Sequence, residues 1–191
     1  MGRVLAFLFG VVSYVLFLVA FLYAIAWVNN VSLPEWVPYT IDNGRMSGSL
    51  IEALLINSGL LGLFAVQHSI MARIWFKKIW TRIVSPAIER SIFVLLTSLI
   101  LFLMYWQWRT LGDPVWNLTG STAGMALEVL GYIGWLIVLL STFMINHFDL
   151  FGLRQVTLYL QKKPYTPVKF QTTGFYRFLR HPLMLGFMIA F

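Results

Sequence analysis

The chain has 191 residues, of which 59% are hydrophobic and 11% are charged. A soluble globular domain carries about 25% charged residues and roughly 45–50% apolar ones, so this composition excludes an ordinary water-soluble fold and predicts a protein that lives in lipid. The 16 Phe, 8 Trp and 8 Tyr need burial, which excludes a disordered chain. There is no cysteine. Disulfides, thiolate metal sites and a cysteine nucleophile are therefore excluded, and any thiol in the chemistry comes from a substrate.

Four segments are long and apolar enough to cross the hydrocarbon core, which takes about 20 residues of helix. They lie at residues 4–28, 50–72, 92–108 and 126–145. A fifth apolar run occupies residues 183–191, which is too short to cross at about 1.5 Å per residue. This ending predicts that the sequence is part of a longer chain. The expected fold is all-α: a single domain over residues 1–191, built as a polytopic transmembrane helix bundle with four full spans and the start of a fifth.

Basic residues predict how the bundle is oriented. Twelve of the fourteen Lys and Arg residues fall at the N-terminus, after the second span or after the fourth, and the two opposite loops hold only Arg45 and Arg109. Cytoplasmic loops carry the excess of Lys and Arg, so the N-terminus and both basic loops are expected in the cytoplasm. This topology explains the net charge of +7. Membrane lipids are the expected partners of these cations, and neither nucleic acid nor an obligate protein partner is implied.

The first basic loop has the pattern of a helix that lies in the plane of the membrane interface. Between Arg73 and Arg82 the cations recur at helical spacing, with aromatic and branched apolar residues between them. An interfacial amphipathic helix needs this alternation of faces. The segment is therefore predicted to anchor the chain to the lipid surface.

Polar residues near membrane spans are costly, so they indicate where chemistry could occur. His68 lies near the cytoplasmic end of the second span, and His147 and Asp149 close the fourth. A loop over residues 147–182 follows, and its length within a compact bundle, together with its aromatic and basic content, favours a functional cap. Arg154 lies in this loop and is suited to a lipid phosphate or to a substrate. No metal site is predicted.

The end of this loop is the most informative segment. Pro182 suits the first turn of a helix, where its missing N–H costs nothing. Arg180 and His181 are thereby placed just before a helix N-terminus, whose unpaired N–H groups and positive dipole end favour an anion such as a carboxylate. Gly186, four residues into the helix, predicts the close approach of a flat or bulky ligand.

This segment carries a resemblance. The pattern Gly174-x-Tyr176-x-x-x-Arg180-His181-Pro182-x-x-x-Gly186 resembles the cofactor motif of the integral-membrane methyltransferases that include isoprenylcysteine carboxyl methyltransferase and bacterial phospholipid methyltransferases. More narrowly, other blocks resemble the bacterial methanethiol S-methyltransferase group and the similar NnrU-like proteins: Val66 to Ser69, Pro86 to Ser91, Asn146 to Gln155 and Pro164 to Pro167. The resemblance covers essentially the whole chain and implies a location in the bacterial inner membrane.

The resemblance implies transfer of a methyl group from S-adenosylmethionine to methanethiol. It implies that the cofactor is held by Gly174, Tyr176, Arg180, His181, Pro182 and Gly186, with Arg180 at the cofactor carboxylate. The reaction needs a thiolate, so a neutral histidine that accepts the thiol proton is expected. His181 and His147 are the candidate bases, with Asp149 to orient His147. Arg154 and His68 are the candidates for binding the small thiol.

The chain departs from the family pattern in two places. Met184 stands where family members often have Tyr, so a hydroxyl contact is lost. The family continues through a helical hairpin to an acidic pair and a Tyr-rich tail that complete the cofactor pocket, and residues 1–191 contain none of these features. Weak cofactor binding by residues 1–191 alone is therefore expected.

Three alternatives remain open on the residues alone. A prenylcysteine carboxylate or a lipid amine is compatible with the same cofactor motif, and only the narrower resemblance selects methanethiol. A b-type cytochrome is possible because His68 and His147 are expected at the same depth on two helices, as paired axial haem ligands would be. A non-catalytic accessory membrane protein is allowed by the NnrU-like resemblance.

Overall fold

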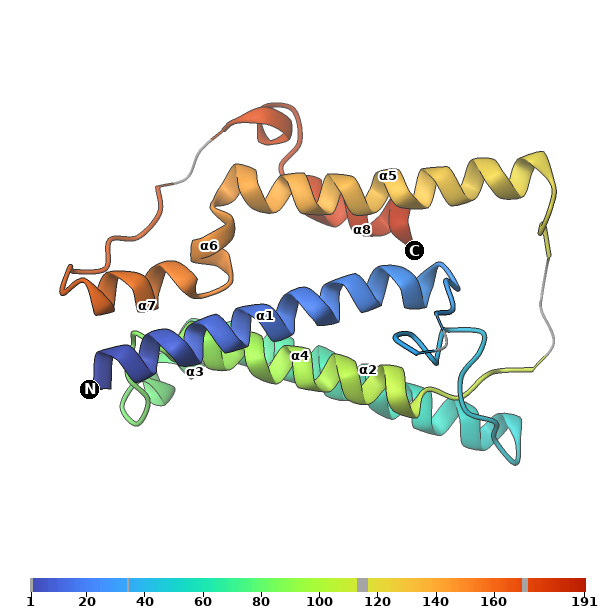
Figure 1. The fold of residues 1–191 in the computed structure, drawn as a ribbon, viewed down its shortest axis with the longest axis horizontal. Coiled ribbons are helices and arrows are strands. Elements are labelled where there is room, and N and C mark those ends of the chain that lie inside the picture. Colours follow the sequence, from blue (N-terminus) through green and yellow to red (C-terminus); the bar gives the residue numbers. More distant parts are fainter. Residues whose placement is uncertain (1, 34, 113–116, 170–171) are drawn as a thin grey trace. The chain divides into compact units, whose positions relative to one another are not determined.

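A computed structural model describes residues 2–33, 35–112, 117–169 and 172–191 (Figure 1). The described chain is helical, with no strand and two isolated β-bridges. Its elements, in order, are α1 (Gly2–Val28), α2 (Leu50–Ala72), α3 (Ile74–Trp80), α4 (Glu89–Gln107), α5 (Thr122–Ile145), α6 (His147–Leu150), α7 (Leu153–Leu160), the 3₁₀ turn η1 (Gly174–Arg177) and α8 (Pro182–Ala190). The prediction of an all-α membrane bundle is confirmed.

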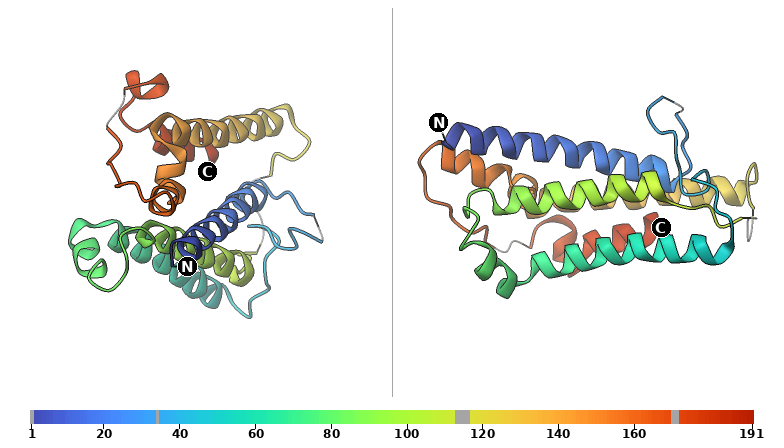
Figure 2. Two further views of the ribbon diagram at one scale, coloured as in Figure 1. Left: turned by 60° about the vertical axis from the view of Figure 1, so that its left-hand side comes forward. Right: turned by 90° about the horizontal axis from the view of Figure 1, so that it is seen from below.

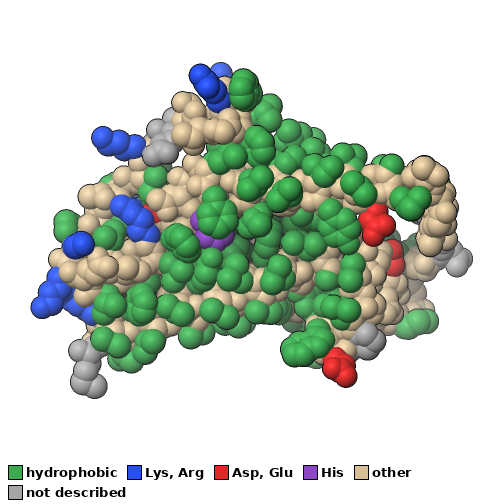
Figure 3. Space-filling model, turned by 45° about the horizontal axis from the view of Figure 1, so that its top comes forward, with side chains coloured by type: hydrophobic (Ala, Val, Ile, Leu, Met, Phe, Trp, Pro, Cys, Tyr) green, Lys and Arg blue, Asp and Glu red, His purple; other side chains and the backbone are tan. Residues whose placement is uncertain are grey.

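Four helices, α1, α2, α4 and α5, are long and apolar enough to cross a membrane. Large apolar side chains remain exposed along them, such as Leu5 and Leu22 on α1, and hydrophobic side chains cover much of the face drawn in Figure 3. Lipid can cover such side chains, whereas water could not without a large cost in free energy. The protein is therefore an integral membrane protein.

The helix ends differ from the predicted spans by a few residues, and local capping explains part of this. The Ser121 hydroxyl accepts a hydrogen bond from the Gly124 N–H, so α5 begins four residues before the apolar window. Helix α4 begins at Glu89 and so includes two charged residues in its first turn. The predicted loop over 147–182 is in part helical, because α6, α7 and η1 lie within it. Residues 170 and 171 of that loop lie outside the described residues.

The chain divides into two compact units. Unit 1 comprises residues 1–111 and 151–166, and unit 2 comprises residues 112–150 and 167–191. In unit 1, α4 packs against both α1 and α2, and α7 lies along α1 (Figure 2). In unit 2, α8 lies along α5 (Figures 1 and 2).

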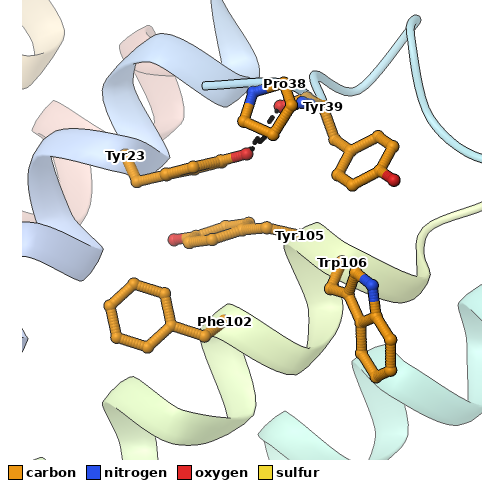
Figure 4. A pocket seen from close by; sticks show the side chains of 6 residues that line it. All are labelled: Tyr23, Pro38, Tyr39, Phe102, Tyr105 and Trp106. Atoms are coloured by element: carbon orange, nitrogen blue, oxygen red, sulfur yellow. Dashed lines mark hydrogen bonds between the residues drawn. The ribbon is translucent and has the colours of Figure 1, made fainter. Parts of the chain in front are cut away.

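Aromatic side chains fill one end of unit 1. The ring of Tyr105 stacks on that of Tyr23 at 4.7 Å between centroids, and its buried hydroxyl donates to the Ala20 carbonyl. Trp27 and Trp108 meet edge to face at 5.1 Å. Beside this cluster lies a cavity of about 200 Å³ (Figure 4). Its lining is almost wholly apolar and comprises Tyr23, Pro38, Tyr39, Phe102, Tyr105 and Trp106.

Glycines set the spacing of the two helices in unit 2. A Cβ placed on Gly186 would lie 2.8 Å from the Val138 backbone nitrogen and 2.9 Å from the Gly134 carbonyl oxygen, both on α5. A Cβ on Gly134 would in turn lie 2.6 Å from the Ala190 nitrogen on α8. Small residues allow helix backbones to approach closely in membranes, where van der Waals packing drives helix association. The sequence predicted the close approach of a ligand at Gly186, whereas the structure shows the close approach of α5 at this position.

Gly152 is the N-cap of α7 and packs against the first turn of α4 within unit 1. It has φ +89°, and a Cβ there would lie 2.9 Å from the buried Ser91 hydroxyl oxygen and 3.0 Å from the Ser91 nitrogen. Both a left-handed conformation and close backbone contact require glycine.

Gly152→Ala is accordingly expected to lower the free energy of unfolding by about 2–4 kcal/mol, because backbone strain adds to overpacking. Gly112→Ala is the matched control, since Gly112 has φ +95° but nothing within 4 Å of its Cβ position. This control is expected to cost only about 1–2 kcal/mol, which is the strain alone. Denaturant unfolding of the two variants in detergent measures the difference. Equal losses would show that the Ser91 contact contributes nothing.

Candidate functional site

The segment that precedes α8 is held against the end of α5 in unit 2. Gly174 adopts φ +54°, and a Cβ there would lie 2.6 Å from the Met144 side chain. The Thr173 hydroxyl donates to the Met144 carbonyl at 3.4 Å, and the Phe175 N–H approaches the Met144 sulfur at 3.3 Å. Glycine is therefore favoured at position 174 by its left-handed conformation, whereas the flexible end of the Met144 side chain could move aside. Tyr176 follows in η1, where partial burial raises the pKa of its hydroxyl.

Helix α8 begins at Pro182, as predicted from the sequence. His181 is its N-cap, yet no side-chain hydrogen bond caps the helix among the described contacts. Arg180 and His181 are both exposed, whereas Pro182 is buried. Two solvent-facing basic side chains therefore flank the positive end of a nine-residue helix. These donors suit an anion such as a carboxylate.

His147 is buried, with 4% of its surface exposed, at the start of α6. Its ring stacks on that of Phe143 at 4.2 Å, and its Nδ1 lies 2.8 Å from the Thr142 hydroxyl oxygen. That hydroxyl donates its single hydrogen to the Leu139 carbonyl at 2.6 Å. If the hydroxyl hydrogen points to Leu139, the Thr142 oxygen accepts from an Nδ1–H, and in this tautomer the acceptor lone pair of the neutral ring is on Nε2. Burial lowers the pKa of His147, which favours this neutral form.

The buried state of His147 predicts a pH dependence of stability. Histidine in an unfolded chain titrates near pH 6.5, so below this pH the unfolded state binds more protons than the native state. The free energy of unfolding should therefore fall as the pH drops from about 6.5 toward the lower native pKa. His147→Gln is expected to lose less stability than the wild type when thermal unfolding is compared between about pH 7.5 and pH 5.5. His181→Gln, at an exposed position, is the control, and equal slopes for all three proteins would contradict this prediction.

Asp149 was expected to orient His147. The Asp149 backbone N–H donates to the Asn146 side-chain oxygen at 3.1 Å. The described contact that orients the imidazole comes from Thr142, which the sequence analysis did not single out. The only sequence signal for this contact was the position of Thr142, five residues before His147 at the end of a predicted helix. A role for Asp149 stays a prediction.

In unit 1, His68 and Arg90 lie against the same aromatic ring. The His68 ring lies 5.1 Å from that of Phe93, and the Arg90 guanidinium carbon lies 5.1 Å from the Phe93 centroid. His68 also stacks on Phe64 at 5.3 Å. The sequence placed Arg90 among the basic residues after the second span and in a resemblance block, and it gave no signal for Phe93.

Arg154 contacts the segment that follows α7. Its guanidinium donates to the Thr166 carbonyl and to the Thr166 hydroxyl, both at 2.8 Å, and lies 5.3 Å from the Tyr165 ring centroid. These contacts give Arg154 a structural role in holding residues 164–166 near α7. Its assignment to the substrate stays a prediction.

The predicted site residues are thus divided between the two units. Unit 2 holds His147, Asp149 and the whole segment from Gly174 to Gly186, and unit 1 holds His68 and Arg154. Among residues 2–33, 35–112, 117–169 and 172–191, no group of three or more His, Asp and Glu could hold a metal ion. His68 lies in unit 1 and His147 in unit 2, and the haem alternative stays a prediction.

Comparison with known proteins gives the family. The chain is 51% identical over all its 191 residues to a methanethiol S-methyltransferase of Mycobacterium tuberculosis, covering 76% of that protein. It is 47% identical over 191 residues to a methanethiol S-methyltransferase of Crocosphaera subtropica, covering 73% of it. Nurim of Xenopus laevis is 28% identical over 148 residues, which cover 70% of this chain and 50% of nurim.

No family model matches the chain, and no solved structure matches it. The relatives are nevertheless similar over its entire length, at an identity far above the level at which membership of a family is in question. This membrane chain therefore belongs to the methanethiol S-methyltransferase family.

Proposed function

We propose that the protein is an integral-membrane methyltransferase that moves a methyl group from S-adenosylmethionine to methanethiol. The products are dimethyl sulfide and S-adenosylhomocysteine, and the thiol proton is released to water. The observation that carries the proposal is identity of about half of all residues, over the whole chain, with two proteins that bear the name methanethiol S-methyltransferase.

The exposed basic pair before α8 is proposed to bind the methyl donor. Arg180 would hold the donor carboxylate through charge-assisted hydrogen bonds, helped by the N-terminal N–H groups of α8. Tyr176, Gly174 and His181 lie in the same segment and complete this proposed surface. The donor supplies an electrophilic methyl carbon on a sulfonium. Gly186 and Pro182 are proposed to act through the placement of α8, because both are buried.

The protein's own task is then to position the thiol and remove its proton. The thiolate is the nucleophile, and a free thiol near neutral pH is mostly protonated: a cysteine, for comparison, has a pKa of about 8.5. His147 is proposed as the general base, because burial lowers its pKa and favours the neutral imidazole, which can accept a proton. His181 is the second candidate, and Arg154 and His68 remain candidates for contact with the thiol.

A membrane location suits this chemistry. Methanethiol and dimethyl sulfide are small and apolar, so both can enter and leave through lipid, while a charged donor requires an aqueous face. We propose that this face is the cytoplasmic one and that the membrane is the bacterial inner membrane. The excess of Lys and Arg in the segments that carry the N-terminus, α3 and the 151–182 region supports this orientation.

The direct test is gas chromatography of the head space above cells that express the complete gene. Labelled dimethyl sulfide is expected from methyl-labelled S-adenosylmethionine and methanethiol in membranes from these cells, and none from cells with an empty vector. Label found in a prenylcysteine ester or in a phospholipid would instead identify another acceptor. No transfer to any acceptor would favour an accessory role, and a Soret band in the purified protein would identify a haem protein.

A further inference from the structure

The aromatic cavity at one end of unit 1 has no part in the proposed methyl transfer. It has a volume of about 200 Å³ and is lined by side chains of α1, α4 and the segment that follows α1 (Figure 4). The Tyr23 hydroxyl donates to the Tyr39 carbonyl at 3.1 Å, and the Tyr105 hydroxyl donates to the Ala20 carbonyl at 3.1 Å. Because these hydroxyl hydrogens are used within the protein, the cavity offers mainly aromatic carbon to an occupant. A cavity with such a lining stays dry and takes an apolar group.

The cavity lies about one and a half helical turns inside the ends of α1 and α4. Tyr23 comes five residues before the end of α1 at Val28, and Phe102 comes five residues before the end of α4 at Gln107. At about 1.5 Å per residue this is a depth of roughly 7–8 Å, which is close to the thickness of the head-group layer on each side of the hydrocarbon core. Trp106 lines the cavity and is 52% exposed, so the lining can be reached from outside. The depth suits the first carbons of a lipid acyl chain.

Arg45 places a cation directly beside the cavity. Its guanidinium carbon lies 4.9 Å from the Trp106 ring centroid and 5.9 Å from the Tyr39 ring centroid, and both residues line the cavity. Its Nε donates to the Trp106 carbonyl at 2.9 Å in the last turn of α4, where the helix dipole favours a cation. These contacts hold the guanidinium in place. Among the described residues neither Nη group of Arg45 has a hydrogen-bond partner, so these donors remain for a ligand.

A second arginine is fixed next to Arg45 through the backbone. Arg45 and Arg109 are partners in a parallel β-bridge, in which the Arg45 N–H donates to the Trp108 carbonyl at 2.9 Å. The buried Asn57 side chain on α2 holds the Arg109 backbone, because it donates to the carbonyl at 2.8 Å and accepts from the N–H at 2.9 Å. Arg45 and Arg109 are also the only basic residues of the loops that join α1 to α2 and α4 to α5. The cations of these loops are therefore held together at the end of α4.

The carboxylates closest to Arg45 in the chain have contacts of their own. Asp42 accepts from the Asn30 amide at 2.5 Å, and Glu52 accepts from the Gly48 N–H at 2.9 Å. Within the described part of the chain, neither arginine of this pair forms a salt bridge. A cation beside an apolar aromatic cavity suits a ligand that has an anionic group joined to an apolar chain.

We propose that this end of unit 1 binds a phospholipid, with the phosphate on the Arg45 guanidinium and the first part of one acyl chain in the aromatic cavity. Arginine presents a planar fork of donors that matches the oxygens of a phosphate. A free phosphate would leave the cavity unused, and a hydrocarbon alone would leave the arginine unused. The lipid comes from the leaflet away from the N-terminus and α3, because α1 and α4 run between the two ends of unit 1. No residue of the proposed methyl-transfer site takes part, so this inference is independent of the proposed function.

The first experiment measures lipid binding by native mass spectrometry of the detergent-solubilised protein expressed from its complete gene. Dioleoyl phosphatidylethanolamine is expected to form a one-to-one complex before further lipids bind. Dioleoylglycerol lacks the phosphate and should bind at least about tenfold more weakly, because the charge-assisted hydrogen bonds are lost. Equal affinity for these two lipids would overturn the proposal. Binding of glycerophosphoethanolamine or inorganic phosphate as tightly as the lipid would also overturn it, since the site would then take a free phosphate group.

Variants of Arg45 test the contact with the phosphate. Arg45→Gln should weaken the binding of phosphatidylethanolamine at least about tenfold, and Arg45→Lys should restore part of it, because the charge is kept without the planar fork. Arg82→Gln is the matched control, since Arg82 is an exposed arginine just after α3, at the opposite end of unit 1. Equal losses in Arg45→Gln and Arg82→Gln, or no loss in either, would overturn the proposal. Thermal unfolding confirms that each variant is folded.

A second experiment locates the acyl chain in the wild-type protein and so does not depend on a variant that folds. The probe is a phosphatidylethanolamine with a photoreactive diazirine near the start of one acyl chain, added in detergent at a concentration where only the one-to-one complex forms. Peptide mass spectrometry after irradiation should find the label on the cavity lining, at Tyr23, Phe102 or Trp106. Leu55 is the reference, because it is 70% exposed and lies five residues inside the start of α2. Equal labelling of Leu55 and the cavity lining would show general contact with lipid and would overturn the proposal.

Discussion

Gly186→Ala is expected to lower the free energy of unfolding by about 2 kcal/mol or more, since the added methyl group overpacks a helix contact. The Cβ would lie within 3 Å of two backbone atoms of α5, and backbone cannot move aside as a flexible side chain can. Because α8 would have to shift, Arg180 and His181, which directly precede it, would shift too. Methyl transfer should therefore fall together with stability. Thermal unfolding in detergent and head-space analysis measure the two effects.

Gly59→Ala is the control for this substitution. Gly59 also lies within a helix, on α2, but nothing lies within 4 Å of its Cβ position. Alanine favours helix over glycine by about 1 kcal/mol, so this variant should be as stable as the wild type or slightly more so. A Gly186→Ala protein with normal stability and a raised KM for S-adenosylmethionine would mean that Gly186 faces the donor instead of α5.

Arg180→Ala should raise the KM for S-adenosylmethionine strongly and leave unfolding unchanged. The side chain is exposed, so its loss leaves no cavity. A hydrogen bond to a charged group contributes about 1.5–3 kcal/mol, which corresponds to a rise in KM of about 10-fold to 100-fold. Steady-state kinetics with the donor varied and methanethiol saturating measure this effect. Arg180→Lys should recover only part of the affinity because lysine lacks the planar fork of donors.

Arg177→Ala is the matched control for Arg180→Ala. Arg177 is also exposed and lies at the end of η1, three residues before Arg180. A general effect of positive charge at the membrane surface would change both variants equally. A donor KM that is normal in Arg180→Ala would remove the donor site from the start of α8.

The spans could be predicted closely because membrane insertion is governed by length and hydropathy. The bounds of α2 agree with the apolar window of 50–72, and α8 begins at Pro182 as expected. The start of α4 was missed because Glu89 and Arg90 are polar, and a hydropathy window stops at charge although a helix does not. Helix α7 was missed for a related reason, since it is short and its stability comes from packing against α1.

The sequence predicted which residues form the candidate site, but it could not predict which of their side chains contact one another. The exposed pair before α8 follows from the position of Pro182, which is local information. The role of Gly186 could not be predicted from the sequence, because a glycine indicates close approach but does not indicate whether a ligand or a helix approaches. The contact of Thr142 with His147, and the contacts of His68 and Arg90 with the Phe93 ring, depend on which side chains meet after folding. His68 lies on α2 and Arg90 on α4, so the sequence pattern of a single helix cannot predict that both contact Phe93.

The edge-to-face contact between Trp27 and Trp108 gives unit 1 an optical signature of its own. Two indoles 5.1 Å apart in a rigid core couple their electronic transitions, and the near-ultraviolet circular dichroism of such a pair vanishes when fixed packing is lost. Trp135 lies in unit 2, where it packs against Phe187 and Phe191. Spectra of a Trp108→Phe and a Trp135→Phe variant would therefore assign melting signals to one unit or the other, so that the order in which the two units lose their structure becomes measurable.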